Sequence, residues 1–92
     1  MKAHVKIYLD YFDLGEQSIF QCEACTKELP IQGLEIHHIH GRGVGKDVID
    51  NLCCLCRKCH ERAHSSKNYV SKDEFAYIHK NFMQGNRKQF LK

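Results

Sequence analysis

The chain has 92 residues, a formal net charge of +3 and a pI near 8.5, and it contains six cysteines and seven histidines. A domain of this size buries only about 60–65 % of the surface that it exposes when unfolded, so its apolar core is thin. An additional stabilising cross-link, such as bound metal or disulfides, is therefore expected. No apolar run is long enough for a signal peptide or a transmembrane helix, which argues against a membrane protein and predicts a cytoplasmic one.

The cysteines and histidines indicate which kind of cross-link this chain has. Thiols stay reduced in the cytoplasm, where clustered cysteine and histidine more often bind metal than form disulfides. An even number of cysteines would also fit three disulfides in a secreted protein, but the histidines interleave with the cysteines, and this favours metal. The positive charge gathers in the cysteine-rich half and in the last thirteen residues. Such a distribution is compatible with nucleic-acid binding, although the charge alone does not establish it.

The first half of the chain predicts short elements. Residues 5–12, VKIYLDYF, favour a strand because β-branched and aromatic residues dominate them. Residues 22–30, CEACTKELP, predict a tight turn closed by a cysteine pair. A short strand is expected at residues 34–39, LEIHHI. The glycine-rich residues 41–47, GRGVGKD, then predict a loop.

The second half predicts one extended segment and two helices. Residues 51–56, NLCCLC, are apolar and favour an extended conformation, and a short helix is expected from near Cys56 to about Ser65. The clearest helix is the last one, at about residues 72–84.

This last helix carries signals at both ends. Ser71 and Glu74 form a capping-box pair at its start, and Gly85 occupies the position of a C-terminal cap. Its apolar face includes His79, which we expect to be packed in the core rather than to serve in a site.

Two C-x2-C pairs predict a zinc site. Cys22 and Cys25 form the first pair, and Cys56 and Cys59 form the second. Four thiolates suit the closed tetrahedral coordination of structural zinc. Cys53 and Cys56 also have this spacing, but the pair at the start of a helix is favoured because the positive end of the helix dipole stabilises thiolates. Cys53 and Cys54 are then expected to be buried as small apolar residues.

Five further histidines remain available for chemistry: His37, His38, His40, His60 and His64. His60 and His64 are four residues apart, so they project from one face of the expected helix. His37 and His38 are neighbours in a strand and point to opposite faces. One of these two can join the helix as a metal ligand while the other acts on water or substrate. A Cys2His2 finger (Cys22, Cys25, His37, His40) is the alternative, and it would leave Cys56 and Cys59 unpaired.

The sequence LEIHHIHGRGVGKDVIDNLCCLCRKCHERAH resembles the HNH endonuclease family. In that family a short apolar strand ends in His-His or Asp-His followed by an aliphatic residue, here His37-His38-Ile39. A glycine-containing loop comes next. Asn51-Leu52 and the C-x2-C-His sequence that ends at His60 follow in this chain. The resemblance implies a small α+β fold, with a ββα-metal, treble-clef-like core over about residues 22–65 and a four-cysteine zinc site. We expect one domain spanning residues 1–92, with the helix at about 72–84 as an addition.

The resemblance also implies residue roles. It places one catalytic divalent ion on His37, His60 and His64, and it makes His38 the general base. Asn51 would orient that base or touch the metal. Zinc on Cys22, Cys25, Cys56 and Cys59 would be structural. Cationic side chains beside the expected site are candidate phosphate contacts: Arg42, Arg57, Lys58 and Arg62.

These roles predict a metal-dependent DNA endonuclease. A neutral imidazole can take a proton from water near pH 7, and the resulting hydroxide can attack phosphorus in line. The products would carry 5′-phosphate and 3′-hydroxyl ends, and a monomer would nick one strand. The catalytic ion would be Mg²⁺, Mn²⁺, Ni²⁺ or Zn²⁺. We expect DNA as the partner, a monomer or weak dimer, and neither a membrane nor a small-molecule substrate. The alternatives are a non-catalytic zinc-ribbon module that binds nucleic acid and a metal-sensing or protein-interaction domain.

Overall fold

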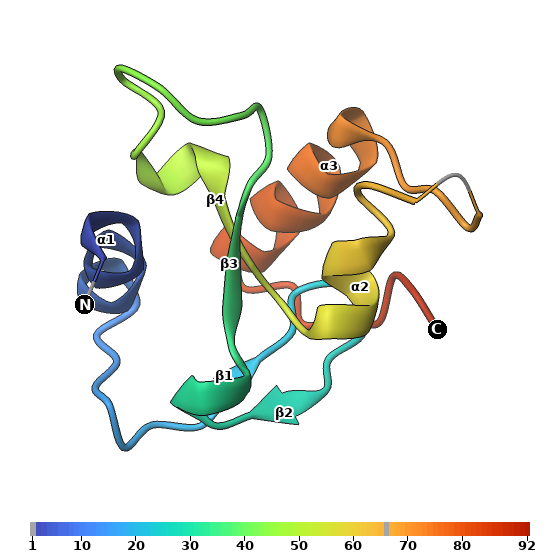
Figure 1. Ribbon diagram of the computed structural model, residues 1–92. Coiled ribbons are helices and arrows are strands. Elements are labelled where there is room, and N and C mark those ends of the chain that lie inside the picture. The colour runs from blue at the N-terminus through green and yellow to red at the C-terminus, as the bar shows by residue number, and fades with distance from the viewer. Residues whose placement is uncertain (1, 66) are drawn as a thin grey trace.

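The computed structural model describes residues 2–65 and 67–92. Two short antiparallel sheets and several helices make up a small α+β fold, as the sequence predicts (Figure 1). No helix in these described residues is both long enough and apolar enough to cross a membrane.

The chain begins with a helix, α1 (Ala3–Tyr11), so the strand predicted for residues 5–12 is wrong. Tyr8 and Leu9 are buried, and Val5 and Phe12 pack beside them. These four positions follow the 3.6-residue period of a helix rather than the two-residue period of a strand. Burial of this apolar stripe therefore outweighs the β propensity of the individual residues.

A tight turn with Cys22 and Cys25, called the knuckle below, follows between β1 (Phe20–Gln21) and β2 (Glu28–Leu29), which pair antiparallel. The Cys22 amide donates to the Lys27 carbonyl at 2.8 Å, and the Thr26 amide donates to the Cys22 carbonyl at 2.9 Å. The tight turn predicted for residues 22–30 is therefore present. A short 3-10 helix, η1 (Ile31–Gly33), leads into the next strand.

The centre of the fold is the antiparallel pair of β3 (Glu35–His38) and β4 (Leu52–Leu55), with His37 opposite Cys53 and His38 opposite Leu52. The predicted loop separates them, followed by the 3-10 helix η2 (Ile49–Asn51). All four β4 side chains are buried, and they alternate between two core clusters. Leu52 and Cys54 face the cluster around α1, and Cys53 and Leu55 face the other.

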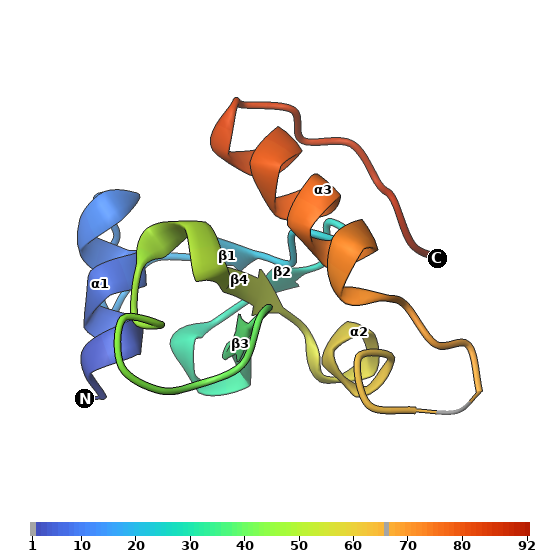
Figure 2. The ribbon, with the colours of Figure 1, turned by 90° about the horizontal axis from the view of Figure 1, so that it is seen from above.

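Helices cover both faces of this strand pair. α1 lies on one side, whereas α2 (Arg57–Glu61) and α3 (Lys72–Met83) lie on the other, as Figures 1 and 2 both show. The helix predicted from near Cys56 to about Ser65 is shorter than expected. It ends at Glu61, and turns bonded from i to i−3 continue it to His64.

α3 confirms the predicted C-terminal helix. The Ser71 Oγ accepts from the Glu74 amide at 3.2 Å, and Gly85 adopts a φ of +92° just beyond the helix end. A left-handed conformation of this kind favours glycine. Phe75, Ile78 and His79 are buried on its inner face, as expected.

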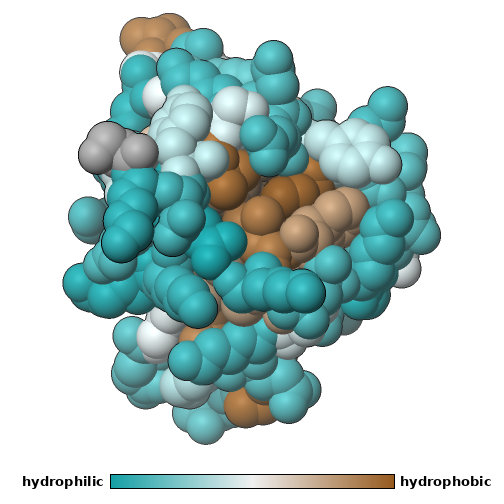
Figure 3. All heavy atoms as spheres, turned by 90° about the vertical axis from the view of Figure 1, so that its right-hand side faces the viewer, coloured by the Kyte–Doolittle hydropathy of each residue, from teal (hydrophilic) through white to brown (hydrophobic). Residues whose placement is uncertain are grey.

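The C-terminal segment returns to the knuckle. The amides of Phe90 and Leu91 donate to the Ala24 carbonyl at 2.7 and 2.9 Å, and both side chains pack on the edge of the core cluster that contains Cys53 and Leu55. The face that carries α2 and this segment shows an apolar hollow inside a hydrophilic rim (Figure 3).

Candidate active site

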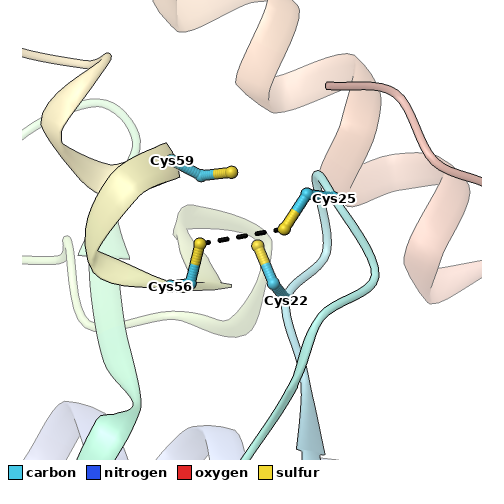
Figure 4. Close-up of side chains that lie close together, drawn as sticks. All are labelled: Cys22, Cys25, Cys56 and Cys59. Carbon is cyan, nitrogen blue, oxygen red and sulfur yellow. Dashed lines mark hydrogen bonds between the residues drawn. The ribbon is translucent and has the colours of Figure 1, made fainter. Parts of the chain in front are cut away.

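Four thiols converge from two separate parts of the chain. Cys22 and Cys25 come from the knuckle, whereas Cys56 is the N-cap of α2 and Cys59 lies in its first turn. All four sulfur atoms lie within 4.8 Å of one another, and those of Cys25 and Cys56 are 3.7 Å apart (Figure 4). None of the six cysteines forms a disulfide. Four converging thiols fit the tetrahedral coordination of zinc.

Hydrogen bonding favours ionisation within this group. A bond from the Cys59 thiol, together with backbone amides, lowers the pKa of Cys22 to about 4 against the effect of burial. The same hydrogen bond is the largest cause that raises the pKa of Cys59, and burial raises it further. A proton shared in this way leaves one thiolate ready for a cation.

Cys53 and Cys54 lie apart from the four, inside β4. Burial raises the pKa of both thiols, and the charge of Glu23 adds to this, so both stay protonated. The structure therefore groups Cys56 with Cys59 rather than with Cys53. It also separates His37 from Cys22, and this removes the Cys2His2 alternative.

Three histidines form a second cluster beside the first. His37 projects from β3, His60 from α2 and His64 from the turn after α2, and one nitrogen of each lies within 4.8 Å of the others. Ring centroids are 4.9 Å apart for His37 and His60 and 5.6 Å apart for His60 and His64. Burial, with the nearby His60 and His64, lowers the pKa of His37 to about 4, so its ring is neutral. Neutral imidazoles are the form that binds metal.

Glu35 orients one of these rings. Its Oε1 lies 2.7 Å from the His60 Nδ1, and an ionised carboxylate can only accept, so Nδ1 donates and Nε2 is free to ligate. This carboxylate–histidine arrangement accompanies many metal sites. Sequence reasoning missed Glu35, although its position two residues before His37 puts it on the same face of β3.

His38 lies on the opposite face of β3, as predicted. Its Nε2 is 2.8 Å from the Asp47 Oδ1, and by the same reasoning it donates. The Nδ1 is buried and has no hydrogen-bond partner among the described residues. The His4 ring packs edge-on, with centroids 4.6 Å apart. Burial, with His38 and Arg42, lowers the pKa of His4, so this neighbour stays neutral.

Asp47 and His4 were not predicted, because no spacing rule links either residue to His38. Asp47 ends the glycine-rich loop, and His4 lies on a helix that the sequence reading assigned to a strand. A helical reading of residues 5–12 would have brought His4 onto the face that carries Tyr8.

Asn51 holds the loop that follows His38. Its Oδ1 accepts from the His40 amide at 2.7 Å, and its Nδ2 donates to the carbonyls of Gly41 and Lys46 at 3.1 and 2.9 Å. The buried side chain thus joins the two ends of the loop. Its hydrogen bonds go to backbone and not to the His38 ring, so any effect on this ring passes through the loop.

A cavity of about 230 Å³ lies between the three-histidine cluster and His38. It is lined by His37, His38, Ile39, Gly41, Ala63, His64, Val70, Lys72 and Phe75. His37 and His64 of the three-histidine cluster therefore line the same cavity as His38.

The four candidate DNA contacts are spread over the surface. Arg42 is exposed on the loop after His38. Arg57 and Lys58 line a larger hollow of about 780 Å³ next to the cysteines. Arg57 also lies 3.5 Å from Glu35, and the Arg62 Nη2 donates to the Lys92 carbonyl at 2.6 Å. The four cations are thus near the histidine clusters without forming one patch.

Comparison with known proteins finds a family model that matches part of the chain. Residues 22–66 match the model of the HNH endonuclease family. The chain is also 36 % identical over 76 residues to the type IV methyl-directed restriction enzyme EcoKMcrA of Escherichia coli strain K12. The match covers 75 % of this chain and 27 % of that relative, so the chain spans about a quarter of the curated relative's length. No solved structure matches the chain.

Proposed function

Since residues 22–66 carry an HNH endonuclease domain, we propose that the chain is a metal-dependent DNA endonuclease that hydrolyses phosphodiester bonds. One observation carries the proposal: three imidazoles converge on one side of β3, and a fourth, held by a carboxylate, lies on the other side. A set of ligands with open positions beside a separate base is the arrangement of a catalytic metal site. A binding module needs no such base.

His37, His60 and His64 would hold the divalent ion. Three imidazole ligands suit Zn²⁺, Ni²⁺ or Mn²⁺ better than Mg²⁺, and they leave coordination positions for substrate oxygens. A bound ion would supply stabilisation of the charge that develops on the phosphate and the leaving oxygen. Glu35 would keep the ligating nitrogen of His60 directed at the ion.

His38 would act as the general base. Because its Nε2 donates to Asp47, its buried Nδ1 carries a lone pair without a protein partner, and it would accept a proton from a water that enters the cavity with the substrate. The water oxygen then forms a bond to phosphorus as the bond to the 3′ oxygen breaks, and the 3′ oxygen takes a proton from solvent. The products are 5′-phosphate and 3′-hydroxyl ends. Asp47 stabilises the imidazolium, and Asn51 keeps the following loop in place.

Cys22, Cys25, Cys56 and Cys59 would hold a structural zinc ion. Zinc at this position fastens α2 to the knuckle and so fixes His60, the residue next to Cys59. Structural zinc of this kind contributes about 10–16 kcal/mol of apparent folding free energy. A 92-residue chain with a thin core benefits from a contribution of this size.

DNA is the proposed substrate, and residues 1–92 would act as one nuclease domain. The curated relative is described as a methyl-directed restriction enzyme, and this chain matches 27 % of it. We therefore propose for the chain the cutting of DNA and not the reading of methyl groups. Arg42, Arg57, Lys58 and Arg62 would contact phosphates, which makes affinity fall with salt. One active site cuts one strand per encounter, so a monomer should nick.

Cleavage of supercoiled plasmid tests the proposal. Purified protein is incubated with Mg²⁺, Mn²⁺, Ni²⁺ or Zn²⁺, and nicked and linear products are followed over time. His38→Ala should retain its fold and zinc and lose cleavage. His40→Ala, in the adjacent exposed loop, should stay within a few-fold of wild type. If the wild-type protein cuts nothing with any of these ions, the non-catalytic binding module is the correct reading.

A further inference from the structure

The cavity between the histidines contains one cation from outside the family segment. Lys72 lines it together with His37, His38 and His64, whereas the HNH match ends at residue 66. The remaining wall is mostly apolar and includes the buried Phe75. Among the described residues that line this cavity, Lys72 is the only one with an ammonium or guanidinium group.

The backbone of Lys72 is held in a fixed place, and its side chain is exposed. Lys72 is the first residue of α3, directly after the N-cap Ser71, whose Oγ accepts from the Glu74 amide. The helix itself is anchored far from its start by His79, whose Nδ1 lies 2.6 Å from the buried Glu23. The anchored helix therefore keeps Lys72 beside the cavity, from where its flexible side chain can reach a bound phosphate.

The charge of Lys72 is also available. It forms no ion pair within residues 2–65 and 67–92, unlike Arg57, which lies near Glu35. Where a bound phosphodiester displaces water from the apolar cavity wall, the attraction between this cation and the phosphate is strengthened. Attack of hydroxide adds negative charge to the non-bridging oxygens, which is where such a cation acts.

We propose that Lys72 is a catalytic residue whose ammonium group contacts a non-bridging oxygen of the scissile phosphate in this cavity. The proposal rests on the nuclease function proposed above and adds a residue from the C-terminal helix to the active site. Binding of a phosphodiester between Lys72 and His37 would place phosphorus in the same space as His38. α3 is then a part of the catalytic apparatus and not only a cover for the core.

Single-turnover nicking at saturating DNA tests this role with three variants. Lys72→Ala should slow the rate by about 10²-fold, a loss typical of one donor to a developing anion. Lys72→Arg should recover most of that loss. Lys80→Ala serves as the matched control, because Lys80 is exposed on the same helix and does not line the cavity; it should match wild type.

DNA binding supplies a second measurement. In a His38→Ala background, Lys72→Ala should reduce the slope of log affinity against log salt by about one, the amount expected for one phosphate contact. Thermal unfolding of each variant checks that the fold is intact. A wild-type rate for Lys72→Ala at saturating DNA, or an equal loss in Lys80→Ala, would overturn the inference and leave the nuclease function standing. If the wild-type chain cuts no DNA, the proposed function fails and this inference fails with it.

Discussion

Glu23 is the most tightly bonded polar side chain of the core. Its carboxylate is fully buried and accepts from the Tyr8 hydroxyl at 2.6 Å, the Cys54 amide at 3.0 Å and the His79 Nδ1 at 2.6 Å. The His79 Nε2 lies 2.7 Å from the Ile49 carbonyl. Because both nitrogens of His79 face acceptors, both carry protons, and His79 is an imidazolium paired with Glu23.

Two substitutions at Glu23 should lower the free energy of unfolding by very different amounts. Glu23→Ala breaks a buried ion pair, which costs about 3–5 kcal/mol, and leaves the Tyr8 hydroxyl and the Cys54 amide buried without an acceptor at about 1–3 kcal/mol each. That loss approaches the whole stability of a small domain. Glu23→Gln keeps the acceptor oxygen, and its amide can donate to a neutral His79 that still donates to Ile49. We therefore expect a loss of only about 1–3 kcal/mol.

The pH dependence gives this prediction a second readout. Burial alone would lower the pKa of His79, but the hydrogen bond and charge of Glu23, with the Ile49 carbonyl, raise it above its usual 6.5. A raised pKa contributes stability that is fully present below 6.5 and is lost as the pH rises through the folded-state value. Glu23→Gln removes this contribution. The advantage of wild type over Glu23→Gln should thus be largest near pH 6 and shrink toward pH 9.

Urea unfolding of the zinc-loaded proteins at several pH values measures both effects. The four zinc cysteines are common to wild type and Glu23→Gln, so their own pH dependence cancels in the difference. Equal losses for Glu23→Ala and Glu23→Gln would show that the carboxylate is not bonded as described. A difference between wild type and Glu23→Gln that does not change between pH 6 and pH 9 would refute the ion pair.

Substitutions at three further residues test the partners of the histidines. Glu35→Gln should weaken binding of the catalytic ion by about 10–100-fold while the tight zinc remains, which metal titration of the purified protein measures. Asp47→Asn should slow nicking by at least about tenfold, because the amide can donate to His38 Nε2 and so move the ring proton to Nδ1; an unchanged rate with an unchanged fold would contradict this. Asn51→Ala should lower stability by about 1–3 kcal/mol and reduce nicking through the loop. Asn51→Asp keeps the acceptor for the His40 amide but sets a second oxygen against the Gly41 and Lys46 carbonyls, so it should lose at least as much.

The convergence of the candidate metal ligands could be predicted from the sequence, because such ligands have fixed spacings. The two C-x2-C pairs and the four-residue spacing of His60 and His64 are set by turn and helix geometry within one short segment. The opposite directions of His37 and His38 follow from the pleat of any strand. Where the geometry is local, sequence and structure therefore agree.

The partners of those ligands could not be predicted, because they come from distant parts of the chain. Glu23 joins α1, the knuckle, β4 and α3 through bonds that span up to 56 residues of sequence. His4 reaches His38 only because residues 3–11 form a helix. That helix was missed because its β-branched and aromatic residues favour a strand locally, and only packing against β3 and η2 decides otherwise.

We expect the three-histidine site to depend on the four-cysteine site, but not the reverse. α2 has five residues, too few to persist without tertiary support, and it carries Cys59 beside His60. Cys59→Ser should therefore unfold the segment and lose both ions. His60→Ala removes a half-buried side chain on the other site and should retain one tightly bound zinc per chain. Metal content and exchange measured on the two variants test this asymmetry. If Cys59→Ser bound the exchangeable ion with wild-type affinity, the three imidazoles would converge without the zinc-held helix.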